Sequence, residues 1–188
     1  MDATCSIQIS IHELSFNQNL MCPGFWVHII LALIFFLVYN IIMNIRKAKE
    51  IDLIRISEIE IFNYRYYFYP IFKNDDYYFN ELQVTNQSSK YNIDNIYVYD
   101  DGVIKGFIEI EDKQIKKLFV EPILHNQKIG SKLITYAIHH FNVEYLYALE
   151  KNIKAIEFYK RHGFKCTNIK ILEEGTEEYL IKLEKHPQ

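Results

Sequence analysis

Hydrophobic residues between positions 53 and 62 follow a helical spacing. A short strand is expected at 44–48, before Asp52, which can cap the start of a helix. The helix itself is predicted because apolar residues recur at about every third position, at Leu53, Ile56, Ile59 and Phe62. One face of this helix should therefore be buried.

The next stretch is rich in tyrosine and is interrupted by Pro70, a residue that breaks a helix interior, so we expect the helix to have ended by that point. The run Asn74-Asp75-Asp76 supplies capping residues for a second short helix that ends near Val84. Residues 86–95 are mostly polar and predict a loop.

Three strands in succession are predicted from the middle of the chain. Alternating and β-branched residues mark 96–99, 103–111 and 114–120. The turn signals Asp100-Asp101-Gly102 and Asp112-Lys113 separate them, which is typical of an antiparallel meander.

Pro122 ends the third strand, and helical spacing of apolar residues resumes at Ile129 and continues to Phe141. A strand at 145–149 and a helix at 154–161 follow, with Gly163 placed for a left-handed cap. The last two strands are expected on either side of 173–176. This order predicts an α+β fold with a mixed sheet and flanking helices, without internal repeats.

Residues 25–43 form an apolar run without formal charge, FWVHIILALIFFLVYNIIM, which is long enough for a transmembrane helix. Arg46, Lys47 and Lys49 follow it, and no basic residue precedes it, so the positive-inside rule places the C-terminal part in the cytoplasm and the tail of residues 1–24 outside. The alternative is that residues 1–42 are a mis-assigned upstream extension. In that case the protein starts at Met43 and is soluble in the cytoplasm.

The composition narrows the classes of function. A chain of 188 residues accommodates one domain with a sizeable core, here expected at 43–188. There are 21 basic and 24 acidic residues, and no basic run is long enough to follow a phosphate backbone, so a nucleic-acid partner is not expected. Three widely spaced cysteines give no metal-ligand pattern and no disulfide framework, so no metal is expected.

The segment Leu118–Ile134, LFVEPILHNQKIGSKLI, carries the strongest chemical signal. A strand end, a loop and a helix start follow one another, which leaves backbone N–H groups unpaired at the positive end of a helix. Gly130 allows close approach of an anion, Ser131 adds a hydroxyl, and Lys128 or Lys132 adds charge. These features together predict a phosphate-binding loop.

Two segments resemble the GNAT family of N-acetyltransferases. Residues 125–130 are similar to its motif A, Q/R-x-x-G-x-G/A after a strand ending in V-x-P; Val120, Pro122 and Gly130 match, while His125 and Lys128 replace the Gln or Arg and the first glycine. The segment ALEKNIKAIEFYKRHGF is similar to motif B, with matches at Asn152, Ala155, Phe158, Tyr159, Gly163 and Phe164. The resemblance extends over the chain from Met43 onward.

The resemblance implies a GNAT fold in which the strands 114–120 and 145–149 splay apart to form a cleft for acetyl-CoA. Main-chain groups of Phe119 and Val120 would bind pantetheine, and Asn152 would line the far side. The pyrophosphate would be held by Asn126, Gln127, Lys128, Ile129, Gly130 and Ser131.

The implied activity is transfer of an acetyl group from acetyl-CoA to a primary amine, with Tyr159 as the general acid for the leaving thiolate. No base is assigned: Gln114 stands where some members carry a glutamate, and Glu109, Glu111 and Glu121 depend on geometry. The acceptor and the oligomeric state are not predicted. Residues 64–78 and the loop before Ile96 are expected to wall the acceptor side. A noncatalytic acyl-CoA-binding module, such as a membrane-tethered sensor, is the alternative function.

Overall fold

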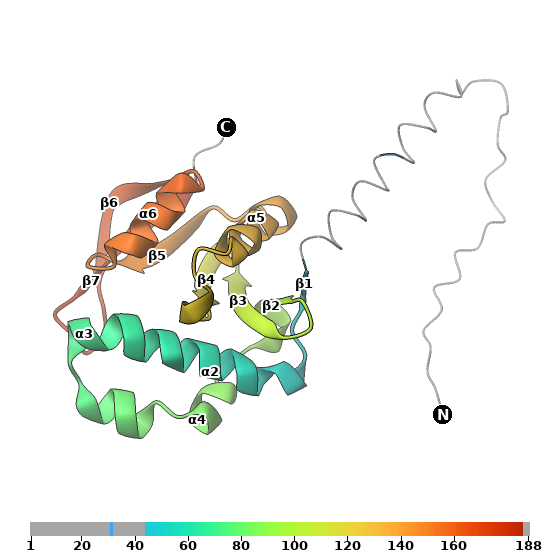
Figure 1. The fold of residues 1–188 in the computed structure, drawn as a ribbon. Helices are drawn as coiled ribbons and strands as arrows, with labels where there is room; N and C mark the ends of the chain where they lie inside the picture. Colours follow the sequence, from blue (N-terminus) through green and yellow to red (C-terminus); the bar gives the residue numbers. More distant parts are fainter. Residues whose placement is uncertain (1–30, 32–43, 186–188) are drawn as a thin grey trace, which may run out of the picture. The chain divides into compact units, whose positions relative to one another are not determined.

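The computed structural model describes residue 31 and residues 44–185 (Figure 1). Apart from Leu31, the predicted N-terminal tail and the predicted transmembrane run at 25–43 lie outside these residues. Within the described part of the chain, no helix combines the length and the apolar character needed to cross a membrane.

Seven strands form one sheet in the order β1-β2-β3-β4-β5-β7-β6, and only β4 and β5 are parallel neighbours among them (Figure 1). The sequence predicts all seven, and β4 and β5 have the predicted bounds. The strands are β1 (Ile45–Lys47), β2 (Ile96–Asp100), β3 (Ile104–Glu111), β4 (Gln114–Val120), β5 (Tyr145–Leu149), β6 (Phe164–Leu172) and β7 (Tyr179–Lys185). The fold is therefore the mixed α+β arrangement expected, with a mostly antiparallel sheet.

The parallel strands β4 and β5 pair over two positions only, Gln114 with Tyr145 and Ile115 with Leu146. A β-bulge lies at the point where this pairing stops. On β3, Glu109 pairs with Lys117 and Ile110 pairs with Ile115, so Lys116 is an extra residue on β4. A bulge bends its strand and increases the local twist. The C-terminal half of β4 consequently has no strand paired to its β5 side.

Helices pack on both faces of the sheet. Leu133, Ile134 and Ala137 of α5 (Ile129–Phe141) are fully buried in one core cluster, which also includes residues of α6 (Ile153–Arg161). Ile56 and Ile59 of α2 (Leu53–Asn63) are buried in another, against β2 and β3. The remaining elements are α3 (Tyr69–Phe72), α4 (Val84–Ser88), π-helical turns at Tyr64–Phe68 and Asp76–Glu81, and 3₁₀ turns at Glu50–Asp52, Ile93–Asn95 and Pro122–Leu124.

The expected helix end before Pro70 is wrong. Helical backbone continues from α2 through the π-helical turn into α3, and it stops at Lys73, which has a left-handed conformation with φ of 52°. Pro70 lies in the first turn of α3, where a residue without an N–H group is tolerated. The wider turn before Pro70 thus allows the chain to stay helical.

Two smaller expectations also differ from the structure. Phe62, predicted on the buried face of α2, is 47% exposed, and the buried face is completed by the polar residues Ser57, Glu60 and Asn63. Side-chain hydrogen bonds compensate for burying these polar groups, as Ser57 donates to the carbonyl of Leu53 and Asn63 to that of Ile59. The predicted loop at 86–95 contains the end of α4 and a 3₁₀ turn.

Candidate active site

A cleft of about 680 Å³ opens beside the unpaired half of β4. Its walls come from the end of β4, the loop 122–128 with the start of α5, one side of α6 along its length, and residues 63–68. Of the ten residues predicted for the site, nine line this cleft: Phe119, Val120, Asn126, Lys128, Ile129, Gly130, Ser131, Asn152 and Tyr159. Gln127 is not among the residues that line it.

The hydrogen bonds of β4 decide which of its main-chain groups face the cleft. The N–H of Glu121 donates to the carbonyl of Lys105 on the β3 side. Main-chain groups alternate in direction along an antiparallel strand, so those of Phe119 also point toward β3. Those of Leu118 and Val120 point away from β3, toward the cleft. The register therefore directs the main chain of Phe119, predicted to contact pantetheine, away from the cleft and brings that of Leu118 to it.

The carbonyl of Val120 accepts two side-chain hydrogen bonds. Asn63 Nδ2 donates over 3.0 Å, and His125 Nε2 lies 3.1 Å away. Because a carbonyl can only accept, His125 Nε2 must carry the proton in this bond. The sequence singled out His125 only as a departure from a motif and did not identify Asn63, whose one signal is a polar residue on a buried helical face.

The loop before α5 uses left-handed conformations at two non-glycine residues, Asn126 with φ of 67° and Lys128 with φ of 62°. Lys128 is the N-cap residue of α5, and its side chain makes no capping hydrogen bond. The N–H groups in the first turn of α5, from Ile129 to Ser131, precede the first possible intrahelical bond. Because this turn lines the cleft, it can hold an anion there.

The start of α6 meets the same cleft. Asn152 is the N-cap residue of α6, and its Oδ1 accepts a hydrogen bond of 3.2 Å from the N–H of Ala155. Lys128, Lys154 and Arg161 add positive charge to the lining, and Glu157 adds one negative charge. The N-termini of α5 and α6 and the net positive charge of the lining make the cleft suited to a ligand with several negative charges.

Tyr159 lies on α6 and is 8% exposed. Burial raises the pKa of its phenol well above the ordinary value, so the hydroxyl stays protonated at neutral pH. Its ring packs edge-on against Phe164 at 6.1 Å. No hydrogen bond to the Tyr159 hydroxyl comes from the described residues, which leaves this proton free for a ligand.

The three glutamates considered as bases do not line the cleft, and neither does Gln114. Glu121 pairs with Arg55 at 2.6 Å, and Glu111 pairs with Lys116 at 3.6 Å. Glu109 lies 3.7 Å from Lys117, on the part of the sheet near the buried Glu60. Gln114 sits at the far end of β4, where β5 is still paired.

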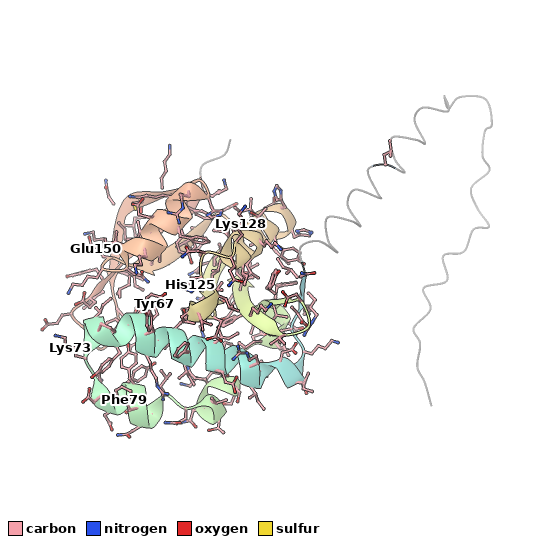
Figure 2. The ribbon with its side chains drawn as sticks, viewed as in Figure 1. Tyr67, Lys73, Phe79, His125, Lys128 and Glu150 are labelled. Carbon is pink, nitrogen blue, oxygen red and sulfur yellow. The ribbon has the colours of Figure 1, made fainter. Side chains whose placement is uncertain are left out.

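Tyr67 and His125 bridge two walls of the cleft (Figure 2). The Tyr67 hydroxyl is 2.9 Å from His125 Nδ1, and their rings are parallel within 4°. In the neutral tautomer with its proton on Nε2, Nδ1 accepts and the phenol donates. Tyr67 belongs to the π-helical turn at Tyr64–Phe68, and such turns occur often at functional sites.

Across the described residues, no group of three or more histidine, cysteine, aspartate or glutamate side chains is arranged to hold a metal ion.

Comparison with known proteins finds one matching family model and several solved structures with a similar fold. Residues 92–166 match the family model described as an acetyltransferase (GNAT) domain. No curated protein sequence matches the chain.

Several solved structures share the fold at low sequence identity. The apo form of YjaB from Escherichia coli is 18% identical, with a TM-score of 0.63 over 74% of this chain and 95% of that one. PaiA N-acetyltransferase from Thermoplasma acidophilum, solved with coenzyme A, is 18% identical, with a TM-score of 0.55 over 73% and 96%. YncA from Salmonella typhimurium, solved with acetyl-CoA, is 17% identical, with a TM-score of 0.55 over 77% and 95%. Residues 92–166 are thus similar to a GNAT acetyltransferase domain, and the described residues share the fold of these solved structures.

Proposed function

We propose that the protein transfers an acetyl group from acetyl-CoA to a primary amine. The observation that carries this proposal is the cleft at the divergence of β4 and β5, where the N-termini of α5 and α6 and a free phenol line one cavity. The family match supports acetyl transfer. The bound coenzyme A of PaiA and the bound acetyl-CoA of YncA support the donor.

In this proposal the pyrophosphate of the donor binds the first turn of α5 and the loop at Asn126–Ser131. Pantetheine runs along the unpaired side of β4, and the main chain of Leu118 replaces that of Phe119 as its partner, together with Val120. Asn152 contributes the capped start of α6 on the opposite wall.

The chemical step is attack of a neutral amine on the thioester carbonyl carbon. A C–N bond forms, the C–S bond breaks, and the electron pair of that bond leaves on sulfur. Tyr159 then donates its proton to the thiolate, which gives free CoA, and solvent restores the proton. The amine loses its proton to water, because the glutamates considered as bases lie outside the cleft lining.

The acceptor side is assigned to the aromatic wall next to the reacting end of the cleft. Tyr64 and Phe68 pack edge-on against Phe119, at 5.6 and 6.4 Å between ring centres, and Phe68 and Phe119 both line the cavity. This wall would admit an amine on an apolar stem. It does not distinguish a small amine, an antibiotic, a peptide N-terminus or a protein lysine.

A CoA-release assay with acetyl-CoA and a panel of amines tests the proposal. Release that depends on one amine, with the acetylated product identified by mass, is the expected result. Tight CoA binding without release for any amine class would instead favour the noncatalytic binding module. Absence of CoA binding would reject both functions.

We also propose that residues 43–188 form the catalytic domain, because all seven strands of the sheet and the helices that pack on it lie within 44–185. A protein that begins at Met43 should unfold cooperatively and bind CoA like the full chain. A truncated protein that is molten, under conditions in which the full chain is folded, would reject this boundary.

A further inference from the structure

Val120 has a carbonyl that is already saturated with hydrogen bonds, although it faces the cleft. A carbonyl oxygen has two lone pairs, and here Asn63 and His125 use both of them. A third strong donor has no place on this oxygen. Any ligand that pairs with the main chain of β4 at Val120 must therefore displace one of these side chains or do without this carbonyl.

Of the two donors, His125 is the easier to displace. Asn63 is 3% exposed, and its Nδ2 also donates to the carbonyl of Ile59 over 2.8 Å. Displacing it from Val120 would leave one buried N–H of its amide without a partner, which is costly. His125 is exposed, so water can replace its lost bond.

His125 is also held from its other side. Its Nδ1 accepts from Tyr67 on the opposite wall, so the two residues form a continuous bridge from the π-helical turn to the carbonyl of Val120. We refer to Tyr67 and His125 as the strap. The hydrogen bond between them polarises the imidazole and strengthens its second bond, to Val120.

We propose that the strap competes with the pantetheine arm of the donor for the carbonyl of Val120, so that donor binding releases His125 from this oxygen. This inference rests on the proposed function, because it takes acetyl-CoA as the occupant of the cleft. On binding, a pantetheine amide N–H replaces the imidazole N–H on the same lone pair. His125 and Tyr67 are positioning residues here and take no part in the chemistry.

The test is the affinity for CoA itself, measured by calorimetry on the full chain. His125→Ala should tighten CoA binding by about two- to tenfold, the effect of removing one net hydrogen bond that the free protein has to break. Tyr67→Phe should tighten it by a smaller factor, and the double variant should resemble His125→Ala alone. Tyr66→Phe is the matched control, because Tyr66 adjoins Tyr67 in the same turn and is 60% exposed; its affinity should equal that of the wild type.

A second readout does not depend on variants. In the nitrogen NMR spectrum of the unliganded wild type, His125 should show a proton on Nε2, and its signals should shift when CoA is added. Unchanged or weaker CoA binding by folded His125→Ala, or imidazole signals that CoA leaves unmoved, would overturn the strap and leave the proposed function intact. If the wild type does not bind CoA, the proposed function fails, and the strap fails with it.

Discussion

Phe158 of α6 covers the α-carbon of Gly130 in the first turn of α5: a methyl group added at Gly130 would lie 3.4 Å from both Cε2 and Cζ of the ring. That distance is an ordinary van der Waals contact. Gly130 therefore allows α6 to pack closely against the start of α5, but the space allows one more carbon. Any side chain longer than alanine must move the ring or extend into the cleft.

Gly130→Asp should weaken CoA binding at least about tenfold, because a carboxylate would compete with the pyrophosphate for the N–H groups of the first turn. The same carboxylate is favourable at a helix N-terminus, so we expect the fold to persist. Calorimetry with CoA measures the loss. Gly130→Ala is the control and should bind nearly as well as the wild type. Equal CoA affinity of a folded Gly130→Asp protein would show that the pyrophosphate lies elsewhere.

Lys128→Gly should raise the free energy of unfolding by about 0.5–1 kcal/mol. Lys128 has φ of 62°, a conformation that costs a residue with a side chain about 1–2 kcal/mol, and the larger unfolded-state entropy of glycine offsets part of the gain. Urea unfolding measures the difference. Lys128→Ala removes the same charge without relieving the strain, so its stability should not rise. Equal stability of the glycine and alanine variants would contradict the strain argument.

Both variants should lose only a little CoA affinity if the ammonium group of Lys128 acts as an exposed charge at the rim. A loss of tenfold or more in Lys128→Ala would instead make this lysine a principal phosphate ligand.

Glu109→Gln should make the protein more stable than the wild type at neutral pH, with the difference shrinking as the pH falls. Burial raises the pKa of Glu109, outweighing the attraction of Lys117. A folded-state pKa above the unfolded value means that the native protein binds the proton more tightly. The stability from this group is therefore complete below the unfolded pKa and is lost as the pH rises through the folded pKa.

Urea unfolding at several pH values from about 4 to about 8 checks this dependence. In the variant, Lys117 keeps its ion pair with Glu60 at 2.8 Å, so the substitution does not leave its ammonium group without a counter-charge. Glu111→Gln is the control on the same strand, where the side chain is 51% exposed compared with 16% for Glu109. A Glu109→Gln protein whose stability follows the pH profile of the wild type would disprove the prediction.

Local signals in the sequence were sufficient for most of the fold. The turn signals Asp112-Lys113 and Asp100-Asp101-Gly102 correctly predicted the turns of the meander. Asp112, Lys113 and Gly102 all have positive φ there. Gly163, expected as a left-handed cap, has φ of 86°. Pro70 was misread because a proline breaks only a helix interior, and a preceding π-helical turn cannot be recognised from residue types.

The site could be predicted where it depends on chain order and not where it depends on contacts between distant segments. The loop and helix start at Asn126–Ser131 follow β4 directly, so their place in the cleft follows from the sequence. The hydrogen bond from Asn63 to Val120 joins residues 57 positions apart, and the one from Tyr67 to His125 joins residues 58 apart. No local pattern encodes such pairs. Whether the main-chain groups of Leu118 point toward the cleft depends on the pairing register of β3 and β4. The bulge at Lys116 shifts this register.

Tyr159→Phe should reduce turnover about a hundredfold or more, the usual effect of a positioned acid, while CoA binding persists. The substitution keeps the ring against Phe164 and removes only the hydroxyl, which the described residues leave without a hydrogen bond, so the stability should change little. The experiment is single-turnover acetyl transfer to an acceptor found in the amine panel, with CoA affinity measured in parallel.

The parallel affinity measurement distinguishes the two roles open to this phenol. If Tyr159 protonates the thiolate, the rate constant for transfer falls and the affinity for CoA does not. If the phenol only binds the donor, affinity falls and the rate constant at saturation is kept. Tyr136→Phe is the matched control, because burial also raises the pKa of Tyr136 but its side chain does not line the cleft. A folded Tyr159→Phe protein that transfers acetyl groups at nearly the wild-type rate would show that solvent protonates the thiolate and that Tyr159 serves only in packing.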